Sequence, residues 1–195
     1  MTSLIVPRLI LASASPRRRE LLAELGVLFE VIPAEVTEYE AADADPREMV
    51  RHNAALKADW VSARHPEATV IGADTTVFVD RTVLNKPRDA AEARTMLRLL
   101  SGRSHTVFTG IAVRRGRDGL KLDEGVASDV QFKRLDEATI ELYLSRVHTL
   151  DKAGGYAIQE ENELIVQKYS GSLTNIVGLP LDEMKQILTR AGLIG

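Results

Sequence analysis

The sequence contains no cysteine among its 195 residues. This absence excludes disulfide bonds, thiolate metal sites and a cysteine nucleophile. The chain also lacks an apolar run close to the roughly 20 residues that cross a bilayer, and its apolar start, MTSLIVPRLILAS, lacks the basic segment of a signal peptide. We therefore expect a cytoplasmic protein that does not bind membranes.

An excess of positive charge is missing as well. The formal net charge is -3 at pH 7 and the sequence pI is about 5.9. Stable nucleic-acid binding requires a basic face, so we do not expect it here. Any bound anion must instead be held locally, by a few well-placed cations. The length of 195 residues suits one domain, either compact or divided into two lobes that share a core.

Predicted strands and helices alternate along the chain, which indicates an α/β fold. Helix starts are marked by Ser15 with Pro16, and by capping boxes that begin at Asp45 and Asp89. The predicted helices cover residues 15–25, 45–64, 89–102, 136–145 and 180–191. The predicted strands cover residues 9–12, 29–32, 68–79, 104–114, 123–132 and 163–169.

Three consecutive arginines, Arg17 to Arg19, lie at the predicted start of the first helix. A helix N-terminus already attracts anions through its free N–H groups and its dipole, so cations placed there oppose the dipole. A bound polyanion would explain them, because guanidinium groups bind phosphate oxygens through two parallel hydrogen bonds. The alternative is an exposed basic turn that interacts with nearby acidic side chains.

Lys57 and Asn53 lie inside the apolar arc of the second predicted helix. An inward-facing lysine either extends its charged end to the surface or meets a negative partner. The pattern is compatible with both, so a ligand-binding lysine and a surface-reaching lysine are both open.

Asp74 and Thr75 lie late in the predicted strand 68–79. A carboxylate within an apolar strand is costly unless it is paired, hydrogen-bonded or bound to metal. Ligands of α/β sheets bind beyond the carboxyl ends of strands, where we expect both residues. Asp74 then holds a divalent cation or deprotonates a water, unless it is an ordinary turn or cap carboxylate. Lys86 precedes Pro87 and is expected to project from a loop, which alone indicates a surface lysine.

Gly154 and Gly155 precede Gln159 in the segment DKAGGYAIQ. Paired glycines allow the backbone to approach a ligand closely. Gln159 offers a donor and an acceptor that match the imide edge of uracil or thymine. Taken alone, the segment is also compatible with a tight turn. The histidines at positions 52, 65, 105 and 148 show no metal-ligand spacing, and we assign none of them to catalysis.

Taken together, these segments resemble the Maf family of nucleotide pyrophosphatases. The matching stretches are LASASPRRRELL, ALKA, VIGADTTV, LNKPRD, SGRSHTVFTG, DKAGGYAIQ and GSLTNIVGLPL, in the family's order over nearly the whole chain. The resemblance implies a Maf/ITPase-like α/β fold. In that fold an elongated mixed β-sheet is flanked by helices, and two lobes of a single domain, residues 1–195, surround a central cleft.

The resemblance also implies cleavage of a nucleoside triphosphate between its α and β phosphates, with Mg²⁺ or Mn²⁺ as cofactor. Asp74 matches the proton acceptor that activates water, and Glu38 with Asp74 forms the implied metal site. Other active-site positions of the family match Ser13, Arg18, Glu38, Lys57 and Lys86. Positions linked to substrate choice match Arg17, Thr75 and Gln159.

The form GGYAIQ resembles the branch of the family that acts on dTTP and UTP. The chain departs from the family at Glu160, at Val147-His148-Thr149 and at Asn85, which replace a usual Gly, a usual Gly-Glu-Pro and a Gly or Glu. A pyrophosphatase for 7-methyl-GTP or a modified nucleotide is therefore an alternative. The family's association with septum formation and cell-division arrest offers another, action through a binding partner. Likeness to the family also predicts a homodimer.

Overall fold

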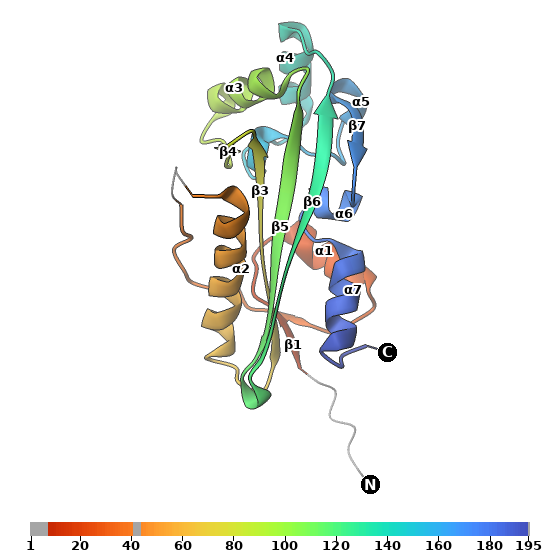
Figure 1. The fold of residues 1–195 in the computed structure, drawn as a ribbon. Helices are drawn as coiled ribbons and strands as arrows, with labels where there is room; N and C mark the ends of the chain where they lie inside the picture. The colour runs from red at the N-terminus through yellow and green to blue at the C-terminus, as the bar shows by residue number, and fades with distance from the viewer. Residues whose placement is uncertain (1–7, 41–43, 195) are drawn as a thin grey trace.

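The computed structural model describes residues 8–40 and 44–194, which form an elongated molecule around one mixed sheet (Figure 1). The strand order is β2-β1-β3-β5-β6-β7, and β4 pairs with β3. The strands are β1 (Leu9–Leu11), β2 (Glu30–Val31), β3 (Thr69–Val79), β4 (Thr82–Leu84), β5 (Ser104–Arg115), β6 (Leu120–Phe132) and β7 (Val166–Ser170).

Helices cover both faces of the sheet. They are α1 (Pro16–Glu24), α2 (Pro46–Ser62), α3 (Ala90–Leu100), α4 (Glu137–Arg146), α5 (Asn162–Ile165), α6 (Leu173–Val177) and α7 (Leu181–Arg190), with short 3-10 turns η1 (Gly116–Asp118) and η2 (Ala153–Gly155). Figure 1 shows α2 along one side of the long strands, α1 and α7 along the other, and α3 and α4 grouped at one end. The expected α/β fold with an elongated mixed sheet is confirmed. Within the described ranges, every helix is too short or too polar to span a bilayer.

A gap interrupts the sheet beside β3. The short strand β1 runs parallel to β3 and pairs only with Thr69–Ile71, while β4 pairs only with Val77–Val79. On its other edge β3 pairs with the antiparallel strand β5 from Thr69 to Phe78. Among the described residues, the middle of β3 therefore has a strand neighbour on one edge only. This gap determines where the site lies.

Helix α2 crosses the sheet at unusually short range. A Cβ atom added to Gly72 of β3 would lie 2.2 Å from the carbonyl oxygen of Ala54, and one added to Gly110 of β5 would lie 2.9 Å from that of Val50. Small buried residues, Ala54 and Ala58 among them, form the helix side of this contact. The two glycines thus let the backbone of α2 approach the sheet, which brings its side chains close to β3.

The helix caps formed where predicted, but without the reciprocal bonds of a capping box. Ser15, Asp45 and Asp89 each accept a hydrogen bond from a backbone N–H in the first turn of their helices. Glu48, however, pairs with Arg51 at 2.7 Å, and Glu92 accepts from the Arg88 N–H at 2.7 Å. Both glutamates have an arginine within reach that competes with the cap N–H, so the capping-box prediction was wrong in this respect.

Short elements account for the other differences. The predicted strand 163–169 begins only at Val166, because residues Asn162–Ile165 form the single turn of α5. Strand β4 and helix α6 were not predicted at all. Segments of three to five residues are too short to display a hydrophobic period. Ser172 caps α6 by accepting from the Asn175 N–H at 3.1 Å.

Candidate active site

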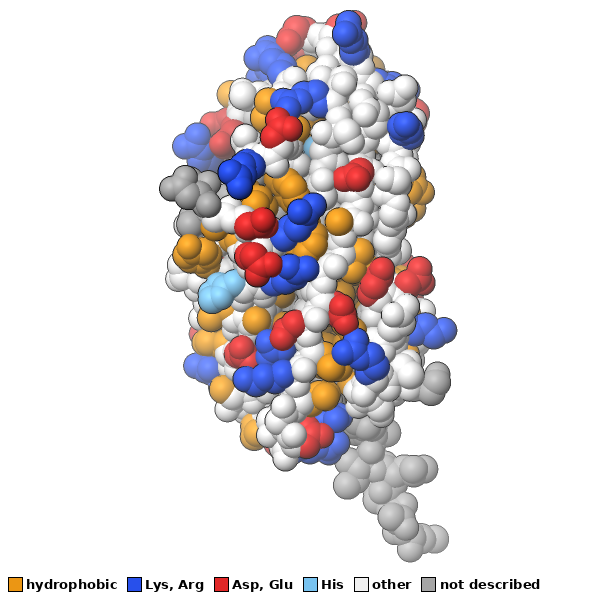
Figure 2. All heavy atoms as spheres, in the orientation of Figure 1, with side chains coloured by type: hydrophobic (Ala, Val, Ile, Leu, Met, Phe, Trp, Pro, Cys, Tyr) orange, Lys and Arg blue, Asp and Glu red, His pale blue; other side chains and the backbone are white. Residues whose placement is uncertain are grey.

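A cleft of about 540 Å³ lies at the gap in the sheet beside β3. It is lined by every residue predicted to form the site: Ser13, Arg17, Arg18, Glu38, Lys57, Asp74, Thr75, Lys86 and Gln159. Segments from six separate parts of the chain thus face one space. On the face in Figure 2, basic and acidic side chains are interspersed, without a broad basic area. Positive charge available to an anion on that face is therefore local.

Asp74 lies in the middle of its strand, which corrects the expectation of a strand end. It is the sixth of the eleven residues of β3. The neighbouring parallel strand β1 ends at Leu11, opposite Ile71, so the carboxyl end of β1 lies just before Asp74. Strand β3 continues because β5 pairs with it as far as Phe78. Ligands of α/β sheets bind beyond the carboxyl ends of strands, and here the strand that ends at the cleft is β1 rather than β3.

Lys57 joins two carboxylates inside the cleft. Its Nζ lies 2.8 Å from Oδ1 of Asp74 and 2.7 Å from Oε1 of Glu38. The side chains of Lys57 and Asp74 are only 11% and 13% exposed. Of the two interpretations of this inward lysine, the one with negative partners is correct. The close approach of α2 to β3 makes the contact possible.

Glu38 is held in its charged form. Burial raises its pKa, but the hydrogen bond and charge of Lys57, together with the charges of Lys86 and Arg18, hold the pKa of Glu38 below its usual value. Lys86 is exposed in the loop after β4 and lines the same cleft. Within the cleft, Glu38 and Asp74 therefore share the buried cation Lys57, and the exposed Lys86 is close enough to affect Glu38.

Arg18 fills the gap in the sheet. Its Nη1 donates to the Ala73 carbonyl at 3.0 Å and to Oγ of Ser13 at 3.2 Å, and its Nη2 donates to Oγ1 of Thr75 at 2.9 Å. Its Nε donates to the Gly178 carbonyl at 2.9 Å. Burial lowers the pKa of Arg18, against the opposing charges of Asp74 and Glu38. Most of its donors thus organise the protein, which the sequence pattern did not indicate.

Asp74 and Thr75 face opposite sides of the sheet, as successive strand residues must. Asp74 meets α2 through Lys57, whereas Thr75 meets Arg18 and also lies 2.9 Å from the hydroxyl of Thr109. The carbonyl of Gly178 accepts from Arg18 and Thr75, and Gly178 also lines the cleft. The motif GSLTNIVGLPL contributed to the family resemblance, but no residue in it indicated that the Gly178 carbonyl would contact the site.

Arg17 links the start of α1 to the loop before η2. Its guanidinium lies 3.5 Å from the carbonyl oxygen and 3.9 Å from the carboxylate of Asp151. The buried Lys152 pairs with the same Asp151 carboxylate at 2.8 Å. Arg19, the third arginine of the cluster, is exposed and is not among the cleft residues. The predicted basic group is therefore divided between three environments.

The paired glycines serve packing within the protein. Gly154 and Gly155 adopt φ values of 75° and 67°, and a Cβ atom on Gly154 would lie 3.0 Å from Val77. We expected the backbone of these glycines to approach a ligand. In the structure the backbone of Gly154 approaches Val77 of β3 instead. Gln159 follows this turn and is exposed at the cleft. The turn fixes where Gln159 enters the site.

Behind this loop lies a buried aromatic group. Tyr156 contacts His105 through a 2.8 Å hydrogen bond between Oη and Nε2, and both rings pack edge-on against Phe132. His105 is 2% exposed, and its Nδ1 has no hydrogen-bond partner among the described residues. Burial lowers the pKa of His105 from 6.5 to about 4. The ring is therefore neutral at physiological pH.

This neutral histidine predicts a loss of stability in mild acid. Below pH 6.5 the unfolded chain takes up a proton at position 105 that the folded chain refuses until about pH 4. The free energy of unfolding should therefore fall, for this residue alone, by about 2 kcal/mol between pH 7 and pH 5. Urea unfolding of wild type and His105→Gln at both pH values measures the difference. An identical pH dependence of the two proteins would contradict the prediction.

Of the carboxylates that line the cleft, Glu38 and Asp74 are the two that Lys57 joins, and this pair suits a divalent cation. In the described part of the chain, no three His, Asp or Glu side chains are grouped as a metal site. Mg²⁺ in nucleotide enzymes is commonly bound by one or two carboxylates together with phosphate oxygens and water. Two carboxylates beside an anion-sized cleft fit that type of site, for Mg²⁺ or Mn²⁺.

Comparison with known proteins agrees with the predicted resemblance. Residues 8–191 match the family model described as Maf-like protein. A dTTP/UTP pyrophosphatase of Akkermansia muciniphila is 45% identical and is covered over 98% of its length, by 96% of this chain. One from Anaeromyxobacter dehalogenans is 48% identical, with 96% of each chain covered.

A solved structure, the Staphylococcus aureus Ham1 protein, is similar in fold alone. It aligns with a TM-score of 0.51 and 12% identity, over 95% of this chain and 99% of that one. This likeness supports the ITPase-like architecture of the sheet. Because the family model and both relatives span almost its whole length, the chain belongs to the Maf family.

Proposed function

We propose that this protein is a nucleoside triphosphate pyrophosphatase that hydrolyses dTTP and UTP to the monophosphate and pyrophosphate. The observation that carries the proposal is the cluster of Lys57, Glu38 and Asp74 in a cleft that also contains Lys86 and Arg17. Membership of the Maf family supports it, as do relatives named dTTP/UTP pyrophosphatase.

In this proposal the triphosphate lies along the cations of the cleft. Lys86 and Arg17 are at least partly exposed and able to reach phosphate oxygens. Arg18 helps to bind the tail and at the same time holds Ser13 in place. Fixed cations stabilise the negative charge that develops in phosphoryl transfer, which is the main catalytic effect for this chemistry.

Asp74 accepts the proton of the attacking water. The water oxygen attacks the α-phosphorus, the bond to the bridging oxygen breaks, and pyrophosphate leaves. Lys57 orients the Asp74 carboxylate through its 2.8 Å contact with Oδ1. A divalent cation bound by Glu38 and Asp74 would polarise the phosphate oxygens.

Selection of the base is assigned to the opposite face of β3. The amide of Gln159 can donate to and accept from the imide edge of thymine or uracil. Thr75 has its hydroxyl engaged with Arg18 and Thr109, so it would influence substrate choice through Arg18 rather than by touching the base.

A panel of nucleotides tests the proposal. The purified protein is incubated with Mg²⁺ and dTTP, UTP, CTP, GTP or 7-methyl-GTP, and the products are identified. We expect pyrophosphate and monophosphate from dTTP and UTP, and at least about tenfold less from the others, the effect of about 1.4 kcal/mol in transition-state binding. Preference for 7-methyl-GTP would support the alternative substrate class. Release of inorganic phosphate would contradict the proposal.

The homodimer, the cytoplasmic location and a link to cell division stay predictions. The last has its own test, because a variant without activity separates catalysis from partner binding. If Asp74→Asn still arrested division in cells, partner binding would be supported. Loss of arrest together with activity would oppose a separate binding role.

A further inference from the structure

Asn53 is a buried amide one helical turn before Lys57 on α2. It is 2% exposed. Its Oδ1 accepts from the Tyr39 N–H at 2.7 Å, and its Nδ2 donates to the Tyr39 carbonyl at 3.1 Å. The same Nδ2 lies 3.5 Å from Oδ2 of Asp74. The amide therefore binds both backbone groups of one loop residue and also contacts the carboxylate of the candidate base.

These contacts join the carboxylates of Glu38 and Asp74 to one turn of α2. Residues four apart on a helix lie on the same face, so Asn53 and Lys57 act side by side. Lys57 binds Oδ1 of Asp74 while Asn53 approaches Oδ2. Tyr39 is adjacent to Glu38, whose carboxylate also binds Lys57. Fixing the backbone of Tyr39 therefore limits where Glu38 can go.

We propose that Asn53 is a positioning residue, which fixes the orientation of the Asp74 carboxylate and the place of Glu38 beside it. The proposal rests on the proposed function. The amide suits this role because it offers an acceptor for the Tyr39 N–H and two donors, one for the Tyr39 carbonyl and one for Asp74. An aspartate would lose both donors and would add a negative charge beside Asp74. A leucine would keep the approximate size and lose every contact.

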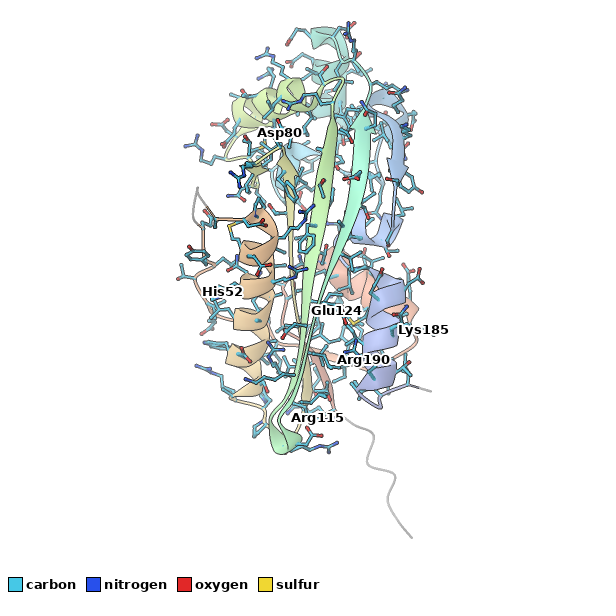
Figure 3. All side chains as sticks on the ribbon, viewed as in Figure 1. His52, Asp80, Arg115, Glu124, Lys185 and Arg190 are labelled. Carbon is cyan, nitrogen blue, oxygen red and sulfur yellow. The ribbon has the colours of Figure 1, made fainter. Side chains whose placement is uncertain are left out.

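Asn53→Leu tests the proposal in the nucleotide assay. We expect kcat to fall about 10- to 100-fold, the usual effect of removing a residue that orients a metal or catalytic ligand. The KM for dTTP should change by less, because the phosphate-binding cations are untouched. The matched control is His52→Ala. His52 is the adjacent α2 residue, exposed in Figure 3, and contacts the ring of Tyr39 rather than its backbone. It should retain wild-type kcat.

Two measurements do not depend on turnover. Hydrogen exchange of peptides that contain Tyr39 should become faster in Asn53→Leu and stay unchanged in His52→Ala. Calorimetric titration with Mn²⁺, without nucleotide, should give at least about tenfold weaker binding in Asn53→Leu. If wild type released no pyrophosphate, the proposed function would fail, and these two measurements would still decide the role of Asn53.

Asn53→Asp provides a second variant in case the leucine variant does not fold. It preserves shape and the acceptor for the Tyr39 N–H, but removes the donors to the Tyr39 carbonyl and to Asp74. We expect its kcat to fall at least as far as that of Asn53→Leu. A kcat within twofold of wild type in a folded variant would overturn the proposal, even if exchange at Tyr39 became faster. Asn53 would then fix only the loop of Tyr39 and not the Asp74 carboxylate. Unchanged Mn²⁺ binding together with unchanged exchange would overturn it too.

Discussion

Replacing Asp74 with asparagine should leave the fold intact and lower kcat by about two orders of magnitude or more, the usual contribution of a general base. Asparagine has the same shape and can still accept from Lys57, so the packing of α2 on β3 is preserved. It cannot take a proton from water at neutral pH. Lys57 also keeps Glu38 as an anionic partner at 2.7 Å, so no buried cation is left without a counter-charge. Pyrophosphate release from dTTP measures the effect.

Asp80→Asn is the matched control for this change. Asp80 lies directly after β3, outside the residues that line the cleft, and is exposed (Figure 3). Its φ of 55° is one that asparagine also adopts readily. The control should have wild-type kcat. If Asp74→Asn turned over dTTP within a few fold of wild type, Asp74 would not be the base.

Gly72→Ala should cost about 3 kcal/mol of folding free energy or more, at the upper end of what overpacking costs. The added methyl group would lie 2.2 Å from the Ala54 carbonyl oxygen and 2.7 Å from the Ala58 nitrogen. Both are backbone atoms of α2, so no side-chain rotation relieves the overlap. The helix must move away from β3 and take Lys57 with it. The folded fraction should therefore lose activity as well, although the new group is apolar.

Gly119→Ala separates this overlap from ordinary glycine strain. Gly119 has a φ of 72°, and an added Cβ would meet nothing within 4 Å. Its replacement should cost only about 1–2 kcal/mol, the price of the left-handed conformation, and leave kcat unchanged. Urea unfolding of both variants measures the difference. Equal losses of unfolding free energy in the two variants would contradict the prediction, because α2 would then move away from β3 at no additional cost.

The sequence predicted the long elements well, and the residues it proposed for the site line one cleft. Proline and side-chain caps mark where α1, α2 and α3 begin, and the inward position of Lys57 follows from a helical wheel. The cleft residues come from distant segments, and the family resemblance, rather than any local pattern, predicted that they meet. Local signals describe neighbours along the chain, whereas convergence depends on how strands pair.

What the sequence did not predict depends on contacts made across space. Asp74 lies mid-strand because the end of the parallel region belongs to β1, a different segment. The donors of Arg18 are occupied because the interrupted sheet leaves the Ala73 carbonyl within their reach. Asn53 stood out as a polar residue on an apolar face, yet its partner Tyr39 lies in a loop with no periodic pattern.

Asp74 and Thr75 are successive residues of β3, so their side chains face opposite sides of the sheet and contact different parts of the protein. Side chains from α2 meet the first residue, while Arg18 and the segment of Gly178 meet the second. The loop that carries Gln159 packs on the Thr75 side, through the contact of Gly154 with Val77. Under the proposed function, substitutions that change the preference for a nucleobase can therefore fall on the Thr75 face of β3 and leave Asp74 and its partners on the other face unchanged.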